Sequence, residues 1–395
     1  MPVVITGLER LASDTVLQKL LKGNVGLLCH SASIDRNYTM SVFHLQKILG
    51  DRLKKLFGPQ HGFVTDVQDN MVESKDFIHP YFKLPIYSLY STTRIPTDEM
   101  LKGLDTIVVD LQDVGTRVYT YIHTLTLLME KCREKNIRIV ILDRPNPVSG
   151  SMVEGNILKK GFESFVGRHP IPQRHGLTIG EVARMAKRFF GADCDLEVIS
   201  MLGWKRSMFF HETGLPYVLP SPNLSSPEST YVYPGTVLFE GTNISEGRGT
   251  TRALEIIGHH KIEPFSFCQK VQKKIQEWKL EGVMIRPLVF RPTFHKYHDL
   301  ACGGLQIHPT TPLRFYSWRF GQMLVRAFFE ELGSDFEWSK KAYEYEYNRL
   351  AIDLINGNDA IKHWCENDGQ LNTLLELEKE NMDEYLSNRE SILLY

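Results

Sequence analysis

The sequence lacks the biases that would by themselves assign a class of protein. Basic and acidic residues nearly cancel, at 46 against 47 in 395 residues, so nothing favours nucleic acid or a polyanionic surface as a partner. No apolar run reaches the roughly 18 residues that suggest a membrane span. The first residues also lack the basic and apolar segments of a secretory signal. We therefore expect a cytoplasmic location for this chain.

Metal and cofactor signatures are also missing. The 6 cysteines form no CxxC pair, which argues against a disulfide framework and favours buried thiols in a reducing compartment. The histidines at 259–260 and 295–298 lack the tight spacing of metal ligands. No GxGxxG follows the first predicted strand, and no P-loop occurs. We expect neither a metal nor a cofactor.

What is present is an alternation of strands and helices in the first 200 residues. The predicted helices lie at 40–49 and 119–135, and a third begins at the Thr178–Glu181 capping box. Apolar strands separated by helices predict an α/β fold with a Rossmann-like, open and mainly parallel sheet. The predicted strands are 24–30, 52–57, 105–111, 138–143 and 195–201.

The pattern changes after about residue 260. We predict a Rossmann-like catalytic domain over 1–258 and a smaller α+β auxiliary domain over 259–395. An aromatic-rich segment at 342–350 is expected to be a helix that packs against a domain face. The other elements expected in the second domain are helices at 265–278 and 317–332 and a strand at 283–290.

Ligands of open parallel sheets bind beyond the carboxyl ends of the strands. In this sequence, Gly- and Pro-rich segments that carry polar side chains occur at several such positions. Rigid loops of this composition predict one convergent polar cleft rather than independent turns. The segments are 58–63, 112–121, 143–147, 174–176, 221–223 and 240–249.

The residue types in these loops indicate the ligand. Tyr119 and Tyr121 offer apolar faces with polar tips, and nearby carboxylates are suited to general acid and base roles. An anionic sugar fits this set well, and a phosphorylated metabolite is also compatible with it. The arginines that we expect to pair with a carboxylate or phosphate are Arg117, Arg144, Arg174 and Arg248.

Longer strings carry a family resemblance. They include LFGPQHGF (56–63), GLDTIVVDLQDVGTRVYTYI (103–122), ILDRPNPVSG (141–150) and FEGTNISEGRGTTRALE (239–255). On these and further motifs along essentially the whole chain, the sequence resembles the NamZ-like (YbbC-type) exo-β-N-acetylmuramidases, formerly a domain of unknown function. The resemblance implies a glycosidase, intracellular or secreted, that releases N-acetylmuramic acid from non-reducing ends of peptidoglycan fragments. The lactyl carboxylate of that sugar would explain the arginines.

The chain departs from the family pattern at one position. Many members read PEHG where this chain has Gln60, and an amide has no proton to donate at neutral pH. The next carboxylates are Asp66, Asp69 and Glu73. The segment that begins at Asn70 is similar to an Asn-Met-x-Glu segment of a QHG-type branch, and this resemblance favours Glu73 as the general acid.

A glycosidase usually needs a second carboxyl group, unless the 2-acetamido group of its substrate acts as the nucleophile. We expect Asp110 or Asp113 in the second position, although either can instead cap the following helix. Two further pairings are open, Arg144 with Asp143 and Arg248 with Glu246.

The substrate-binding prediction covers polar residues of all the loops. Two alternatives remain open, a hydrolase of another anionic amino sugar and a non-catalytic sugar-binding protein with an altered acid loop. The predicted binding residues are Gln60, His61, Arg117, Tyr119, Tyr121, Arg144, Asn146, Glu154, Arg174, His175, Asn223, Glu240, Asn243, Glu246 and Arg248.

Overall fold

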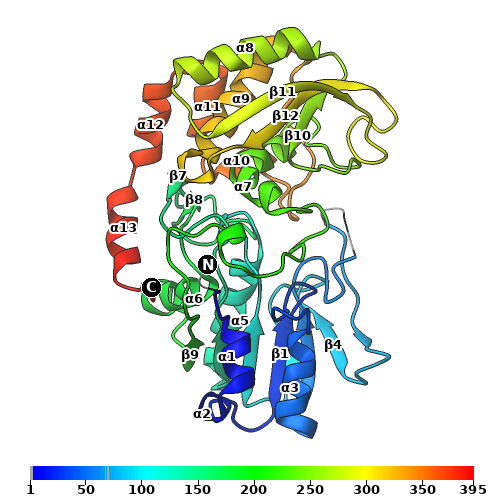
Figure 1. Ribbon diagram of the computed structural model, residues 1–395, viewed down its shortest axis with the longest axis vertical. Helices are drawn as coiled ribbons and strands as arrows, with labels where there is room; N and C mark the ends of the chain where they lie inside the picture. The colour runs from blue at the N-terminus through cyan, green and yellow to red at the C-terminus, as the bar shows by residue number, and fades with distance from the viewer. Residues whose placement is uncertain (1–2, 67, 69–70) are drawn as a thin grey trace.

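The computed structural model describes residues 3–66, 68 and 71–395 (Figure 1). Its largest sheet has seven strands in the order β3-β4-β2-β1-β5-β6-β9. All neighbouring strands are parallel except the short edge pair β3–β4. The predicted Rossmann-like α/β fold is therefore confirmed. The strands are β1 (Val25–Cys29), β2 (Leu53–Gly58), β3 (Phe77–Ile78), β4 (Pro85–Ser88), β5 (Thr106–Asp110), β6 (Arg138–Leu142) and β9 (Leu196–Ile199).

Both faces of this sheet are covered by helices. Leu27 and Val108 pack in one apolar cluster with α1 and α3, while Leu28 and Val109 pack in another with α5 and α6. Successive side chains of a strand point to opposite faces, which is why these strands read as continuous apolar runs. The helices of this part are α1 (Gly7–Ser13), α2 (Thr15–Gln18), α3 (Ser41–Leu49), α4 (Asp98–Leu101), α5 (Tyr121–Lys135) and α6 (Ile179–Phe189).

The rest of the chain forms a second layer beyond one end of the sheet (Figure 1). It contains an antiparallel sheet in the order β10-β12-β11, and a smaller pair, β7–β8, lies below it. Its elements are β7 (Glu154–Ile157), β8 (Pro172–Arg174), α7 (Pro227–Thr236), η3 (Val237–Gly241), β10 (Ile256–His259), α8 (Pro264–Glu277), β11 (Val283–Phe290), β12 (Cys302–Pro309), α9 (Ser317–Leu332), α10 (Ala351–Asn356), α11 (Ala360–Glu366), α12 (Leu371–Lys379) and α13 (Met382–Glu390).

Helices α7 and α9 cross with their backbones nearly in contact. A Cβ atom at Gly235 would collide with the backbone of Ser317 and Gly321, and one at Gly321 would collide with Gly235. Only glycine allows this approach. The crossing sets the position of η3, which follows α7 directly and carries Glu240.

The prediction of a helix at 342–350 is wrong. The segment forms a turn in which the backbones of Tyr343 and Glu346 bond to each other, and Glu344 and Tyr345 have positive φ angles of 48° and 68°. Tyr343 and Glu344 are buried, and their side chains bond to Glu240 and Tyr90. These tertiary contacts override local propensity, which is weak for aromatic residues in any case.

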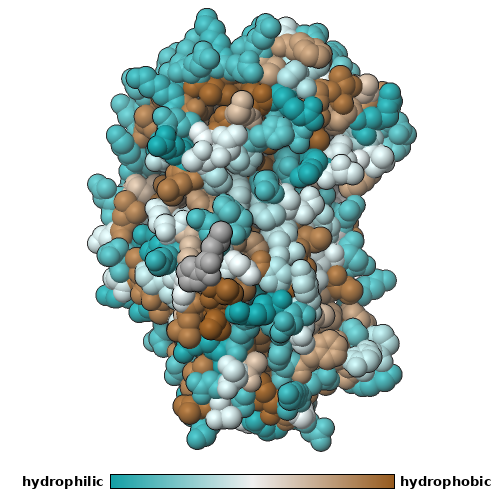
Figure 2. Space-filling view, in the orientation of Figure 1, coloured by the Kyte–Doolittle hydropathy of each residue, from teal (hydrophilic) through white to brown (hydrophobic). Residues whose placement is uncertain are grey.

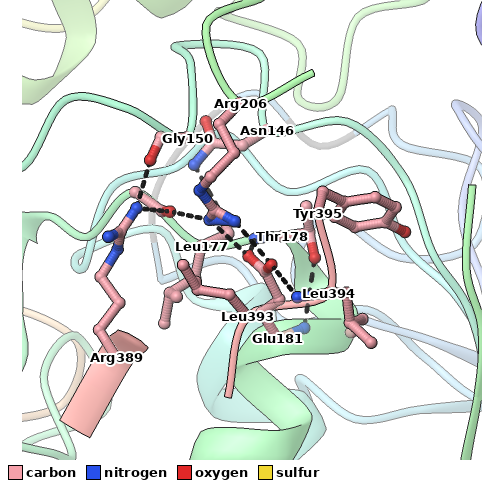
Figure 3. A network of polar contacts seen from close by, with 12 residues as sticks. Asn146, Gly150, Leu177, Thr178, Glu181, Arg206, Arg389, Leu393, Leu394 and Tyr395 are labelled. Atoms are coloured by element: carbon pink, nitrogen blue, oxygen red, sulfur yellow. Dashed lines mark hydrogen bonds and ion pairs between the residues drawn. The ribbon is translucent and has the colours of Figure 1, made fainter. Parts of the chain in front are cut away.

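Helices α12 and α13 run back along the molecule and bring the end of the chain beside α6 (Figure 1). There Arg206 forms two bonds with Glu181, and the backbone N–H of Leu394 donates to the same carboxylate (Figure 3). The Tyr395 hydroxyl donates to Asp143. We call Asp143, Glu181, Arg206 and Tyr395, together with Arg389, the C-terminal clasp.

Two predictions from composition can be compared with these elements. All 6 cysteines are free and buried, as the reducing-compartment pattern predicts. Within residues 3–66, 68 and 71–395, no helix is both long and apolar enough to cross a membrane.

Candidate active site

A small cavity of about 40 Å³ lies beyond the carboxyl ends of β2 and β5. In the sheet, β1 lies between these two strands; β2 and β4 extend the sheet on one side of it, and β5 and β6 extend it on the other. Ligands of this fold usually bind where the strand order reverses in this way. The second layer closes the cavity from above. It is lined by Gln60, His61, Val118, Tyr119, Thr120, Tyr121, Val166, Ser221, Asn223, Tyr233, Glu240, Arg248, Leu254, Tyr343 and Glu344.

Among the described residues, Glu240 is one of two carboxyl groups in the cavity lining. Its Oε1 accepts a bond of 2.6 Å from Nη2 of Arg248, and its Oε2 accepts one of 2.7 Å from the hydroxyl of Tyr343. The guanidinium of Arg248 also donates from Nε to Glu246 at 3.1 Å. A fixed cation and a hydroxyl donor are the partners that an ionised carboxylate needs when it is buried.

Glu344 is the second carboxyl group, and its surroundings differ. Its Oε2 accepts a bond of 2.5 Å from the hydroxyl of Tyr90, and its Oε1 accepts one of 3.1 Å from Nε2 of Gln60. No ion pair within the described chain includes Glu344. Burial raises the pKa of Glu344, and nearby Glu240 adds to that rise. The bonds from Tyr90 and Gln60 and the charge of Arg94 offset part of it. Glu344 thus holds a proton more readily than a solvent-exposed glutamate does.

The amide of Gln60 has a defined orientation. Its Oε1 accepts a bond of 2.6 Å from the hydroxyl of Thr120, which directs Nε2 toward Glu344. Gln60 cannot act as an acid, but it fixes the carboxyl group beside it.

Glu73, the residue that the sequence favours as general acid, does not line the cavity. Its side chain is 41 % exposed and lies 3.9 Å from Nη1 of Arg94. The hydroxyl of Tyr345 donates to it at 3.5 Å. Asp66 is also exposed. Asp69 and Asn70, from the same prediction, lie outside the described residues.

Asp110 and Asp113, the predicted second carboxylates, do not line the cavity. Asp110 is fully buried at the end of β5 and accepts bonds of 2.6 and 2.9 Å from Arg144. The partner of Arg144 is therefore Asp110, not Asp143. Asp113 accepts a bond of 2.7 Å from the backbone N–H of Gly115 and lies 3.4 Å from His175. Both carboxylates hold internal contacts.

Only Arg248 of the four predicted arginines lines the cavity. Arg117 is fully buried and donates to the backbone carbonyls of Asn156, Ile171, Ile355 and Asn356, which ties the sheet domain to α10. Arg174 lies 4.0 Å from Glu154. These guanidinium groups connect the two layers, so they are not available to a ligand in this structure.

The other predicted binding residues divide in the same way. Those that line the cavity are Gln60, His61, Tyr119, Tyr121, Asn223, Glu240 and Arg248. Asn243 and Glu246 line a groove beside it. Asn146 and His175 bond to the backbone of Leu177 instead, and Glu154 accepts the N–H of Trp318 at the start of α9. Burial raises the pKa of Glu154 to about 7.

Sequence reasoning missed the residues that complete the cavity. Glu344 and Tyr343 lie in the segment interpreted as a helix. Tyr90, which donates to Glu344 without lining the cavity, follows β4, a strand that was not predicted. One signal was available. Residues 343–347 alternate aromatic and acidic side chains, a pattern with no continuous helical face.

Comparison with known proteins assigns the family. The model described as "Exo-beta-N-acetylmuramidase NamZ, N-terminal" matches residues 25–228, and its C-terminal counterpart matches 231–395. The chain belongs to the NamZ exo-β-N-acetylmuramidase family. The two family models meet near residue 230, whereas the boundary predicted at 258 falls within β10 and stays a prediction.

A curated relative and two solved structures extend the match over the full length. The protein "Peptidoglycan beta-N-acetylmuramidase NamZ" of Bacillus subtilis (strain 168) is 39 % identical over 395 residues, which cover 100 % of this chain and 92 % of that protein. Crystal structures of two DUF1343 family proteins from Bacteroides fragilis NCTC 9343 are also similar. One has 28 % identity and a TM-score of 0.86 with 100 % of both chains covered. The other has 26 % identity and a TM-score of 0.75 with 99 % of both chains covered.

Proposed function

We propose that this chain is an exo-acting β-N-acetylmuramidase that releases N-acetylmuramic acid from the non-reducing end of peptidoglycan fragments. Family membership supports the reaction, and the cavity supports the location of the site. The observation that carries the proposal is the pair of buried carboxyl groups, Glu240 and Glu344, in one cavity at the carboxyl edge of the sheet.

The two carboxyl groups are suited to different roles. Glycosidases separate acid from base by giving two carboxyl groups unlike environments. Glu240 has a cationic partner in Arg248, whereas burial raises the pKa of Glu344. Glu344 is thus the general acid in this proposal. It gives its proton to the glycosidic oxygen as the bond to the anomeric carbon breaks, and Glu240 stabilises the positive charge that develops on the sugar. Water then adds to the anomeric carbon, and the proton that the water loses passes to a carboxylate of the pair, which completes the hydrolysis.

Gln60 is a positioning residue in this proposal, because its amide donates to Glu344. In relatives with PEHG, position 60 would carry a carboxyl group next to the position of Glu344. Here the amide donates to Glu344 and leaves that residue as the group able to supply a proton. The altered loop is therefore compatible with an active enzyme.

Binding requires the cavity to enlarge. Its volume of about 40 Å³ is far below the roughly 300 Å³ at the lower end of typical ligand sites. We expect the lining side chains to shift when the sugar enters.

The proposal is tested with chromogenic β-N-acetylmuramide against the matching β-N-acetylglucosaminide, which lacks the lactyl group. We expect turnover of the first and little of the second, and cleavage of MurNAc-GlcNAc but not of GlcNAc-MurNAc. Thermal stabilisation by N-acetylmuramic acid without any turnover would instead support a sugar-binding protein. Turnover restricted to another anionic amino sugar would support the other alternative, a hydrolase of that sugar.

A further inference from the structure

A groove of about 890 Å³ opens beside the cavity and shares Glu240 and Tyr343 with it. One wall is the segment 337–343, and Lys296 lies on another. We call it the lysine groove, after Lys340 and Lys341 in that wall. Figure 2 shows that the outline of the molecule narrows between the sheet domain and the second layer. The groove is more than large enough for sugar residues, whereas the cavity is nearly closed.

The position of Glu344 decides which part of a substrate the lysine groove faces. A general acid must contact the oxygen of the leaving group. Segment 337–343 lines the groove, and the next residue is Glu344, which lines the cavity. The groove meets the cavity at Glu240 and Tyr343, so a leaving group that contacts Glu344 can extend into the groove. A second groove of about 520 Å³ shares, among the described residues, only Asn223 with the cavity and contains neither Glu240 nor Glu344.

The charges of the lysine groove favour an anionic occupant. Glu246 is buried, and although burial alone would raise its pKa, Lys296, His295 and Arg248 lower the pKa of Glu246 to about 2. This carboxylate is thus compensated within the protein.

Lys340 and Lys341 are exposed, and in the described part of the chain neither forms an ion pair. Glu337 is an exposed carboxylate in the same wall. The two positive charges of Lys340 and Lys341 exceed the single negative charge of Glu337, so the mouth of the groove carries net positive charge.

We propose that the lysine groove binds the leaving group, which is the glycan on the reducing-end side of the scissile bond. Lys340 and Lys341 bind a carboxylate carried by a second muramic residue of that glycan. The inference rests on the proposed function, because it assigns the leaving-group side of that site. It predicts a preference for longer fragments with an anionic leaving group.

The expected effect is moderate, because exposed charges act mainly on encounter and are screened by salt. The variant K340A/K341A should lower kcat/KM for MurNAc-GlcNAc-MurNAc about three- to tenfold at low ionic strength. Its rates with chromogenic muramide and with MurNAc-GlcNAc, whose leaving groups carry no carboxylate, should stay within about twofold of wild type. The loss should shrink as salt is added.

The matched control is K159A/K160A. Lys159 and Lys160 are also adjacent and exposed, and they do not line the cavity or either groove. This variant should behave as wild type with all three substrates. If wild type cleaves the muramides but K340A/K341A shows no loss specific to the trisaccharide, the inference is overturned and the proposed function stands. If wild type cleaves none of the three, the proposed function itself fails.

Discussion

The cavity and the C-terminal clasp both bury carboxyl groups, yet only one of them has the form of an active site. Burial raises the pKa of Asp143 in the clasp to about 7, and it raises the pKa of Glu344 in the cavity as well. In the clasp, however, Asp143 accepts from the N–H of Gly180 and from the hydroxyls of Thr178 and Tyr395. It lines neither the cavity nor the grooves. A perturbed carboxyl group indicates catalysis only where free space for a ligand adjoins it.

The two clusters also differ in what they connect. The clasp fastens the last residues of the chain to the N-terminal end of α6 through Glu181 (Figure 3). The cavity is assembled from loops after β2 and β5 and from the turn at 343–346. We therefore expect mutations in the clasp to change stability and mutations in the cavity to change rate.

The largest expected effect is on rate. With MurNAc-GlcNAc as substrate, the variant E344Q should lose about 10²- to 10⁴-fold in kcat, the usual contribution of a general acid, while its thermal unfolding midpoint changes little. The control is E73Q, which makes the same change at an exposed glutamate outside the cavity and should remain close to wild type. A large loss in E73Q together with a normal rate in E344Q would restore the prediction made from sequence.

Breaking the clasp should affect stability instead. The variant R206A leaves the buried carboxylate of Glu181 without its ion pair, and we expect a loss of about 3 kcal/mol in the free energy of unfolding. Its kcat, measured well below the unfolding midpoint, should be unchanged. The comparison variant R314A removes an exposed ion pair with Glu281 and should cost less than about 1 kcal/mol. An R206A protein of normal stability would contradict the structural role of the clasp.

The third prediction concerns pH and Asp143. Because its folded pKa is raised to about 7, this carboxyl group contributes stability at low pH that is lost as pH rises through that value. Asparagine cannot ionise, so D143N does not lose this stability. Between pH 5 and pH 8 its free energy of unfolding should therefore rise relative to that of wild type by on the order of 2 kcal/mol. Urea unfolding at both pH values measures this gain. A constant difference between the two proteins would contradict the assignment.

The smallest effect is expected from Q60E, which places a second carboxyl group beside Glu344. Two carboxyl groups about 3 Å apart share one proton, so one apparent pKa of the pair rises. In the pH profile of kcat/KM, the basic limb should therefore move to higher pH by roughly one pH unit. An unchanged limb would show that Gln60 and Glu344 are not coupled in the active enzyme.

The fold was predictable because the strands are continuous apolar runs and the segments between them have helical spacing, with a capping box at Thr178. The position of the site at the carboxyl edge of the sheet followed from the same pattern. Its composition did not follow, because Arg117, Arg144 and Arg174 look like ligand-binding residues in sequence but bond to groups within the protein. Glu344 was missed because its burial depends on contacts with Gln60 and Tyr90, 284 and 254 residues away in the chain.

The central claim is that Glu344 protonates the leaving group, and the dependence of rate on leaving-group acidity tests it most directly. Dinitrophenolate leaves a dinitrophenyl β-N-acetylmuramide without being protonated, whereas the GlcNAc of MurNAc-GlcNAc needs a proton to leave. The account predicts that E344Q retains most of its kcat/KM with the dinitrophenyl substrate and loses at least about 10²-fold with the disaccharide. Equal losses with both substrates, or no loss with either, would contradict it.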